Sequence, residues 1–240
     1  MWRWMDWSRP MPEKKQIDFD EEKHEYSVNG VKVPSVSEIL SPLSAERYAE
    51  LNPAMLRSAA ARGTAVHEAC ELIDYGAEPE IEPDIVGYVQ AYYDFLQTYK
   101  PKWEMIERIV CAYKYLPFGY PDEDNVLFCG TLDRYGIIDG KPSVLDIKTY
   151  ASLTTDSLIQ ASCQTAMYYT AVAEEKMEDL IANRYVLHLK KDGTWRLVNL
   201  GKFDMERGFD SAVVANELVH LWWQLDSARK TKKRGKKSET

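Results

Sequence analysis

Two aspartates and a lysine near the middle of the chain have the residue types and spacing that hydrolysis assisted by a metal ion needs. Asp133 ends the segment Gly-Thr-Leu-Asp, and the segment Asp146-Ile147-Lys148 begins thirteen residues later. On a β-strand, residues i and i+2 project from the same face, so Asp146 and Lys148 would point together while Ile147 faces the core. With Asp133 on the neighbouring strand of a hairpin, its carboxylate would lie beside that of Asp146.

Such a pair of carboxylates would recruit a cation. Two negative charges in a partly buried site repel one another and are costly to desolvate. Hard oxygen ligands at a site that keeps some water favour Mg²⁺ or Mn²⁺ over zinc. A lysine beside that ion can orient or deprotonate an attacking water, or stabilise the charge that develops at phosphorus. The spacing Asp-x-Lys alone is more often an ordinary ion pair on an edge strand. The motifs elsewhere in the sequence must therefore decide between an ion pair and a metal site.

Two helical patterns accompany the acidic pair. The segment from Gly63 to His67 places a histidine in the first long helical region, where a lone histidine is more often packed than ligating. After the Asp-x-Lys strand, Gln160, Gln164 and Tyr168 recur every four residues and form a polar stripe on one helix. Polar groups on a packed helix need partners, which DNA phosphates, bases or the carboxylates of the site could supply.

The elements that would position these residues follow from periodicity and turn residues. Asn29-Gly30 between short β-prone runs predicts a hairpin over residues 17–33, and Ser35 or Ser37 can cap a short helix after it. The further predicted helices are 45–75 with a break near residues 52–53, 84–99, 154–176 and 204–228, and the predicted strands are 104–115, 126–138, 143–149, 182–190 and 194–199. This order predicts an α/β fold with a central mixed β-sheet flanked by helices.

Length and charge divide the chain into three predicted parts. A chain of 240 residues suits one large domain, expected over residues 17–228, after an irregular arm over residues 1–16. The net charge is −8, yet residues 229–240 contain seven basic residues and one acidic residue. We predict a disordered tail there that binds phosphates without reading sequence. Its expected contacts include Lys232, Lys233 and Arg234, and a solvated terminus that only aids solubility is the alternative.

Several classes of protein are disfavoured by what the sequence lacks. Neither GxGxxG nor GxxxxGK[ST] occurs, which disfavours chemistry driven by nucleotides. No run of 18 apolar residues and no signal-peptide core occur, so we expect no membrane contact and a cytoplasmic protein. The four cysteines share no CxxC spacing and are predicted to be buried reduced thiols: Cys70, Cys111, Cys129 and Cys163.

Taken in order, the motifs G-x-x-x-H, G-x-x-D, D-x-K and Q-x-x-x-Y resemble the RecB-like, phage-type exonuclease branch of the PD-(D/E)XK nuclease superfamily. The resemblance covers roughly residues 60–175 and implies a restriction-endonuclease-like core. It implies metal ligands at His67, Asp133, Asp146 and the Ile147 carbonyl, and a catalytic set of Lys148, Asp133 and Asp146. Glu107 resembles an acidic residue that some members add to the metal shell, and Glu104 competes for that assignment.

The resemblance also concerns nucleic acid and partners. The family's helix motif falls on Gln164 and Tyr168, which would lie beside the site and contact nucleic acid. The family's proline is Leu132 here, a change that is common in this branch. Members with an iron–sulfur cluster hold it on four cysteines whose distribution this chain lacks, so no iron–sulfur cluster is expected. The implied partners are DNA as substrate, further copies of the chain in an oligomer, and a single-strand annealing protein.

These patterns together predict a DNA nuclease that depends on Mg²⁺ or Mn²⁺, of a phage or prophage in a bacterial or phage-infected host cell. Its expected role is recombination or repair, as an exonuclease rather than an endonuclease. Two alternatives stay open. The chain could be a nucleic-acid-binding or assembly module that kept the fold and lost turnover, or the four motifs could coincide by chance in an unrelated α/β protein.

Overall fold

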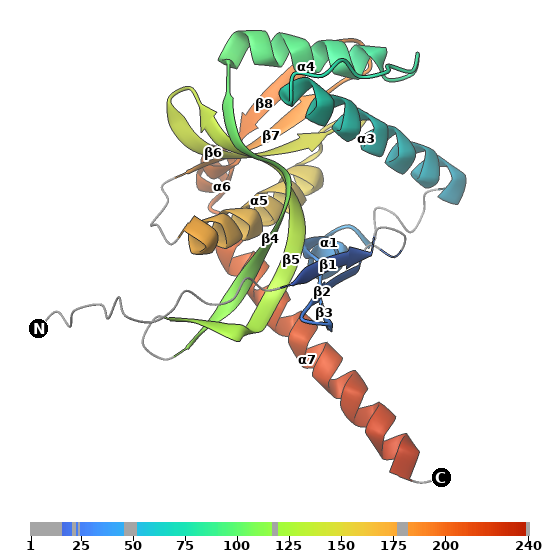
Figure 1. Ribbon diagram of the computed structural model, residues 1–240, viewed down its shortest axis with the longest axis vertical. Coiled ribbons are helices and arrows are strands. Elements are labelled where there is room, and N and C mark those ends of the chain that lie inside the picture. The colour runs from blue at the N-terminus through green and yellow to red at the C-terminus, as the bar shows by residue number, and fades with distance from the viewer. Residues whose placement is uncertain are drawn as a thin grey trace, which may run out of the picture.

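A computed structural model describes residues 16–20, 23, 25–45, 52–116, 120–176 and 182–238 (Figure 1). These residues form one sheet of three strands and one of five, and helices pack against both faces of the larger sheet. The fold is therefore α/β with a central mixed sheet flanked by helices, as predicted. The predicted arm lies outside the described residues except for Gln16. No helix in the described part of the chain is both long and apolar enough to cross a membrane.

The small sheet contains the predicted hairpin. Its strands are β1 (Ile17–Asp20), β2 (Glu25–Val28) and β3 (Val31–Val33). Asn29 and Gly30 form the β2–β3 turn with φ values of 51° and 75°, the positive angles that a two-residue type I′ turn requires. Ser35 then caps helix α1 (Val36–Leu40): its hydroxyl accepts from the Glu38 amide, and the Glu38 carboxylate accepts from the Ser35 amide. A short 3₁₀ turn follows at Ser41–Leu43.

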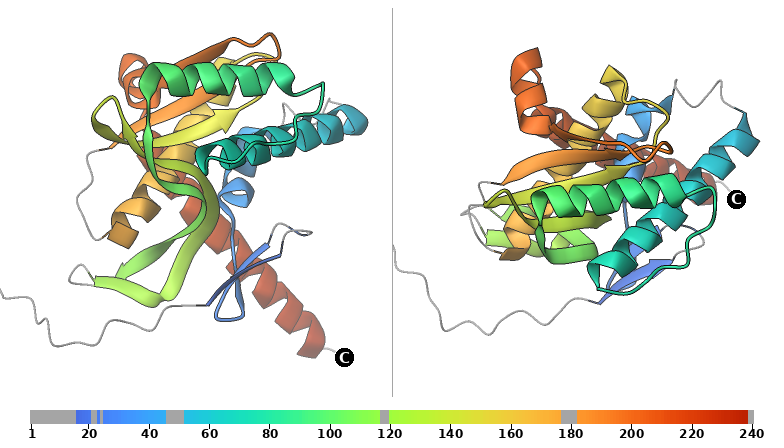
Figure 2. Two further views of the ribbon diagram at one scale, coloured as in Figure 1. Left: turned by 45° about the horizontal axis from the view of Figure 1, so that its top comes forward. Right: turned by 90° about the horizontal axis from the view of Figure 1, so that it is seen from above.

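The large sheet has the strand order β4-β5-β6-β7-β8. Its strands are β4 (Lys102–Leu116), β5 (Tyr120–Ile138), β6 (Lys141–Lys148), β7 (Asn183–Leu189) and β8 (Trp195–Asn199). β6 and β7 are parallel, with helix α5 (Thr155–Lys176) as the crossover that such a pair needs, and the other neighbours are antiparallel. β4 and β5 extend beyond the other strands as a long curved arm (Figures 1 and 2).

Helices cover the two faces of this sheet in separate layers (Figure 2). One layer contains α3 (Pro53–Asp74) and α4 (Val86–Tyr99), and the other contains α5, α6 (Leu200–Arg207) and α7 (Ser211–Ser238). Along β6, Leu145 and Ile147 pack into the core beneath α3 and α4, whereas Val144 packs toward α5 and α7. The predicted inward orientation of Ile147 is therefore confirmed.

The C-terminal helical region differs from the single helix predicted over residues 204–228. Gly208, with a φ of 61°, ends α6, and the chain starts again as α7 at Ser211. α7 then continues through Ser238, so the described backbone is helical over residues 229–238 of the stretch where a disordered tail was predicted, residues 229–240. The prediction allowed the final helix to continue for one turn into this stretch, and the helix continues further than that. Lysine and arginine are good helix formers, and an existing helix extends without a new nucleation step.

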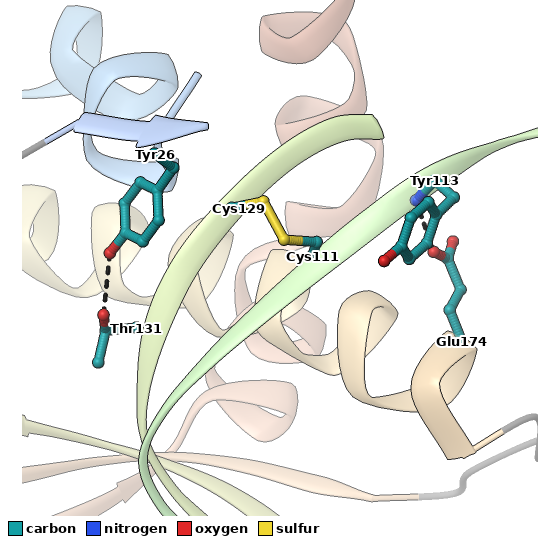
Figure 3. The surroundings of a disulfide bond; sticks show 6 residues. All are labelled: Tyr26, Cys111, Tyr113, Cys129, Thr131 and Glu174. Atoms are coloured by element: carbon teal, nitrogen blue, oxygen red, sulfur yellow. Dashed lines mark hydrogen bonds between the residues drawn. A yellow bond between two sulfur atoms is a disulfide. The ribbon is translucent and has the colours of Figure 1, made fainter. Parts of the chain in front are cut away.

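Cys111 and Cys129 form a disulfide where the sequence predicted reduced thiols (Figure 3). They lie directly opposite one another in the β4–β5 register, with Cα atoms 4.1 Å apart. The prediction considered only local spacings such as CxxC, whereas an antiparallel pair joins residues that are 18 positions apart. Cys70 and Cys163 are free and buried.

Candidate metal centre

The two aspartates of the sequence motif lie where β5 and β6 separate. The ladder between these strands pairs Arg134 with Leu145 and goes no further toward the site. One step beyond that pair lie Asp133 on β5 and Asp146 on β6. There the Ile147 amide donates to Asp133 Oδ2 at 2.6 Å instead of continuing the ladder. The hairpin therefore places the two aspartates opposite one another, at an open end of the strand pair.

Three potential metal ligands converge beside this opening. Single ligand atoms of His67, Glu107 and Asp133 lie within 4.8 Å of one another. His67 Nδ1 is 3.3 Å from Glu107 Oε1 and 3.8 Å from Asp133 Oδ2. His67 Nε2 is 3.1 Å from the Ile147 carbonyl oxygen. Because these residues come from α3, β4, β5 and β6, the cluster forms only when the whole fold is assembled.

Glu107 reaches the cluster through an irregular backbone. Its φ is 42°, in the left-handed region that glutamate rarely adopts, and the β4–β5 ladder skips it between Ile106 and Arg108. Such a conformation costs about 1–3 kcal/mol and tends to be found at functional sites. The competing candidate, Glu104, has a side chain that is 46% exposed and pairs with Lys176. The structure therefore favours Glu107 over Glu104 as the acidic residue of β4.

Asp146 lies beside the cluster, but its side chain is engaged with Lys148. Lys148 Nζ donates to Asp146 Oδ1 at 2.7 Å and to Gln164 Oε1 at 3.1 Å. Asp146 is 1% exposed, and its Oδ2 has no hydrogen-bond partner among the residues that the structure describes. The predicted convergence of His67, Asp133 and Asp146 therefore holds in part. The third residue of the cluster is Glu107, and Asp146 lies next to it with one carboxylate oxygen that lacks a hydrogen-bond partner among the described residues.

Helix α5 supports Lys148 from the other side. Gln164 Nε2 donates to the Tyr168 hydroxyl at 3.5 Å, and the Tyr168 ring packs close to Gly130 on β5. Tyr168 is 4% exposed. Gln164 is thus a partner of the lysine within the protein, and Tyr168 is a partner of Gln164. The predicted contact of both residues with nucleic acid stays a prediction. Lys232, Lys233 and Arg234 lie in the C-terminal part of α7, which runs away from this centre (Figure 1).

Burial and charge shift the pKa values of the site in different directions. Burial lowers the pKa of His67, but the Asp133 and Glu107 carboxylates outweigh it and raise that pKa to about 9. Burial raises the pKa of Asp146 to about 6, because Lys148 opposes it only in part. Burial also lowers the pKa of Lys148, yet the Asp146 carboxylate raises it well above its ordinary value. The site therefore concentrates negative charge that cations must offset.

The donor set fits the divalent ion that was predicted from the sequence. It combines one imidazole, from His67, with oxygen atoms from side chains and one backbone carbonyl. The oxygen donors are those of Glu107, Asp133, Asp146 and Ile147. A set made mainly of hard oxygens suits Mg²⁺ or Mn²⁺, and the orphaned Asp146 oxygen is the kind of buried group that a cation would satisfy.

Sequence reasoning missed an ion pair directly behind Glu107. Arg134 is 0% exposed and donates to Glu107 Oε1 at 2.8 Å and to Asp74 Oδ2 at 2.6 Å. One signal was available: Arg134 follows Asp133 in a strand with apolar neighbours, and a charged residue at a core position needs a partner. The identity of that partner, Asp74, could not be deduced from spacing.

Comparison with known proteins adds little to this geometry. No family model matches the chain, and no curated protein matches it significantly. One solved structure that matches is named "Crystal structure of SSO0001". It shares 14% identity, the match covers 76% of this chain and 84% of that chain, and the TM-score is 0.31. A similarity at this level carries no argument about function.

Proposed function

We propose that the protein is a DNA nuclease that depends on Mg²⁺ or Mn²⁺ and hydrolyses phosphodiester bonds in phage or prophage recombination or repair. The observation that carries the proposal is the convergence of His67, Glu107 and Asp133 next to the Asp146–Lys148 pair. Carboxylates that can hold a divalent ion beside a buried lysine suit the stabilisation of a reacting phosphate. The order of the sequence motifs supports the same proposal.

In this proposal the cluster holds one or two divalent ions through His67, Glu107, Asp133, Asp146 and the Ile147 carbonyl. A bound ion would polarise the phosphate and lower the pKa of a water ligand. Lys148 stays cationic because its pKa is raised, which favours stabilisation of phosphate charge over a role as general base. Asp146 and Gln164 fix the position of its ammonium group at 2.7 and 3.1 Å.

DNA is the proposed substrate, and the basic stretch at the end of the chain is proposed to contact its phosphates. The preference for exonuclease over endonuclease activity, an oligomer of further copies, and a single-strand annealing partner rest on the order of the motifs alone. The body of the chain outside residues 229–240 has 23 basic and 37 acidic residues. Binding of a polyanion by that body therefore depends on bound cations and on the basic stretch.

A second candidate function is a nucleic-acid-binding or assembly module without turnover. One observation favours it: both Asp146 and Gln164 engage the Lys148 ammonium, and Tyr168 is buried, so these motif residues already have partners inside the protein. The two candidates make different predictions for the same assay.

The test incubates linear and closed-circular duplex DNA with the protein and Mg²⁺, Mn²⁺ or EDTA. Loss of linear DNA alone would support an exonuclease, and nicked circles an endonuclease. Binding without cleavage would support the second candidate, and neither binding nor cleavage would contradict both. Glu107→Gln should abolish cleavage, whereas its matched control Glu104→Gln, on the same strand but paired with Lys176, should keep it.

A cytoplasmic location in a bacterial or phage-infected cell is also part of the proposal. The Cys111–Cys129 disulfide bears on it, because reducing systems keep most cytosolic thiols reduced. Trapping thiols in intact cells and mapping them by mass spectrometry tests the location. Complete oxidation of both cysteines in cells would argue against the cytoplasm.

A further inference from the structure

A buried arginine joins the acidic cluster to a carboxylate outside it. Arg134 Nη1 donates to Glu107 Oε1 at 2.8 Å and to the Asp133 carbonyl oxygen at 2.7 Å, while its Nε donates to Asp74 Oδ2 at 2.6 Å. The side chain is 0% exposed. A guanidinium without contact to water depends on neighbouring carboxylates to balance its charge. Arg134 therefore connects the Glu107 carboxylate, and the backbone of Asp133, to Asp74.

Asp74 is the fixed end of this connection. It is the last residue of α3, and its side chain is 2% exposed. The Tyr92 hydroxyl donates to its Oδ2 at 2.6 Å, and Trp103 Nε1 donates to its Oδ1 at 3.1 Å. These donors come from α4 and β4, so the carboxylate cannot rotate without losing a hydrogen bond. Tyr92 and Trp103 thus fix the orientation of Asp74, and Asp74 in turn fixes the orientation of Arg134.

Glu107 is the residue that most needs such support. Its φ of 42° lies in a region that glutamate rarely adopts, and such a strained conformation persists only where surrounding contacts hold it. The oxygen that accepts from Arg134 is also the one that lies 3.3 Å from His67 Nδ1. A planar guanidinium can donate along two directions at once, which an ammonium group cannot do with the same geometry.

We infer that Arg134 and Asp74 are positioning residues that hold the Glu107 carboxylate, next to the backbone of Asp133, in the arrangement a divalent cation requires. Asp74 has a second effect, because it balances the charge of Arg134 and leaves the negative charge of the cluster available to the cation. This inference rests on the proposed function, since it concerns the same cluster.

The test measures Mn²⁺ affinity by calorimetry with the full-length protein and the metal alone. Arg134→Lys keeps the charge and loses the fork geometry, so it should weaken Mn²⁺ binding by about 10- to 100-fold, the usual loss when a residue that supports a ligand is changed. The matched control is Arg184→Lys. Arg184 is also largely buried and pairs with an aspartate, Asp204, at 2.7 Å, while its other bonds go to Ser162 and Ser211. The control should lower the melting temperature and leave Mn²⁺ affinity unchanged.

Equal Mn²⁺ affinity of the wild type and Arg134→Lys would overturn the inference, as would equal losses in Arg134→Lys and the Arg184→Lys control. If Arg134→Lys does not fold, Tyr92→Phe replaces it, because that change removes one hydrogen bond to Asp74 and keeps the ring. It should weaken Mn²⁺ binding by about 10-fold, near the lower end of the same range. Wild-type affinity in Tyr92→Phe would then overturn the inference.

Failure of the proposed function is distinguishable from failure of this inference. A wild-type protein that binds no Mn²⁺ would contradict the metal centre itself. Crystal structures of the metal-free wild type and Arg134→Lys then decide the positioning role. The 3.3 Å contact between Glu107 Oε1 and His67 Nδ1 should be present in the first and lost in the second. Its retention in Arg134→Lys would overturn the inference.

Discussion

Replacing Gly130 with alanine should destabilise the protein, and the size of the effect follows from the surroundings of this residue. A Cβ there would lie 2.8 Å from Val36 Cγ2, and 3.0 and 3.3 Å from Cε1 and the hydroxyl oxygen of Tyr168. Val36 and Tyr168 are only 1% and 4% exposed, so neither side chain can move into solvent. Overpacking of this kind costs about 1–3 kcal/mol. For a chain of this size the melting temperature should fall by about 2–12 °C.

Gly63→Ala is the matched control, and it should have the opposite sign. Gly63 lies within α3, and a Cβ there would meet Thr149 Oγ1 at 3.7 Å, an ordinary contact. Alanine is better than glycine inside a helix by about 1 kcal/mol, which should raise the melting temperature by about 2–4 °C. Differential scanning calorimetry of both variants in one buffer measures the difference. A Gly130→Ala protein as stable as the wild type would refute the close approach of α5 to β5.

Three further predictions concern the lysine, the disulfide and the C-terminus. Lys148→Ala should slow DNA cleavage by about 10²- to 10⁴-fold while metal and DNA still bind, because a charge that stabilises the transition state is lost. Single-turnover kinetics measure this, and wild-type turnover would contradict the role of Lys148. Reduction of the Cys111–Cys129 disulfide should lower the free energy of unfolding by about 3 kcal/mol, the chain-entropy value for a loop of this length, in which the cysteines are 18 positions apart. Denaturation curves that coincide with and without reductant would be inconsistent with the bond. Deletion of residues 229–240 should flatten the slope of log affinity against log salt by about 4–5 on duplex DNA if about four to six phosphates are contacted. Equal slopes in a salt titration of the full-length and truncated proteins would mean that this stretch only aids solubility.

Local signals made the position of the two aspartates predictable. Asp139 and Gly140, with φ values of 50° and 73°, form a tight turn, and such a turn fixes the register of the strands on either side. That register places Asp133 opposite Asp146, as expected from the spacing of the motifs. The hairpin at Asn29 was predictable for the same physical reason. In both cases the information lies within a few residues of the turn.

Contacts between distant residues were not predictable from one sequence. The choice of Glu107 over Glu104 depends on a backbone with positive φ, which no residue type at that position signals. The Arg134–Asp74 pair joins β5 to the end of α3 across 60 positions. The pairing of Cys111 with Cys129 required the register of β4 and β5, which shifts at irregularities such as the one between Ala112 and Tyr113.

The continuation of α7 to Ser238 changes the mechanics of the basic C-terminus. Trp223 Nε1 donates to the Leu127 carbonyl oxygen and fixes the helix to β5 at that point. The segment 224–238 would then extend for about 22 Å as a rod, since a helix rises about 1.5 Å per residue. A rigid helix fixes the distance and direction of its charges relative to Trp223, whereas a flexible tail would let these charges take many positions around that point. A duplex held by both the body and the helix end would have a footprint set by that length, about six base pairs longer at 3.4 Å per step. Removal of seven residues, which is close to two helical turns, would shorten the footprint by about 10 Å and rotate the remaining charges by only about 20°.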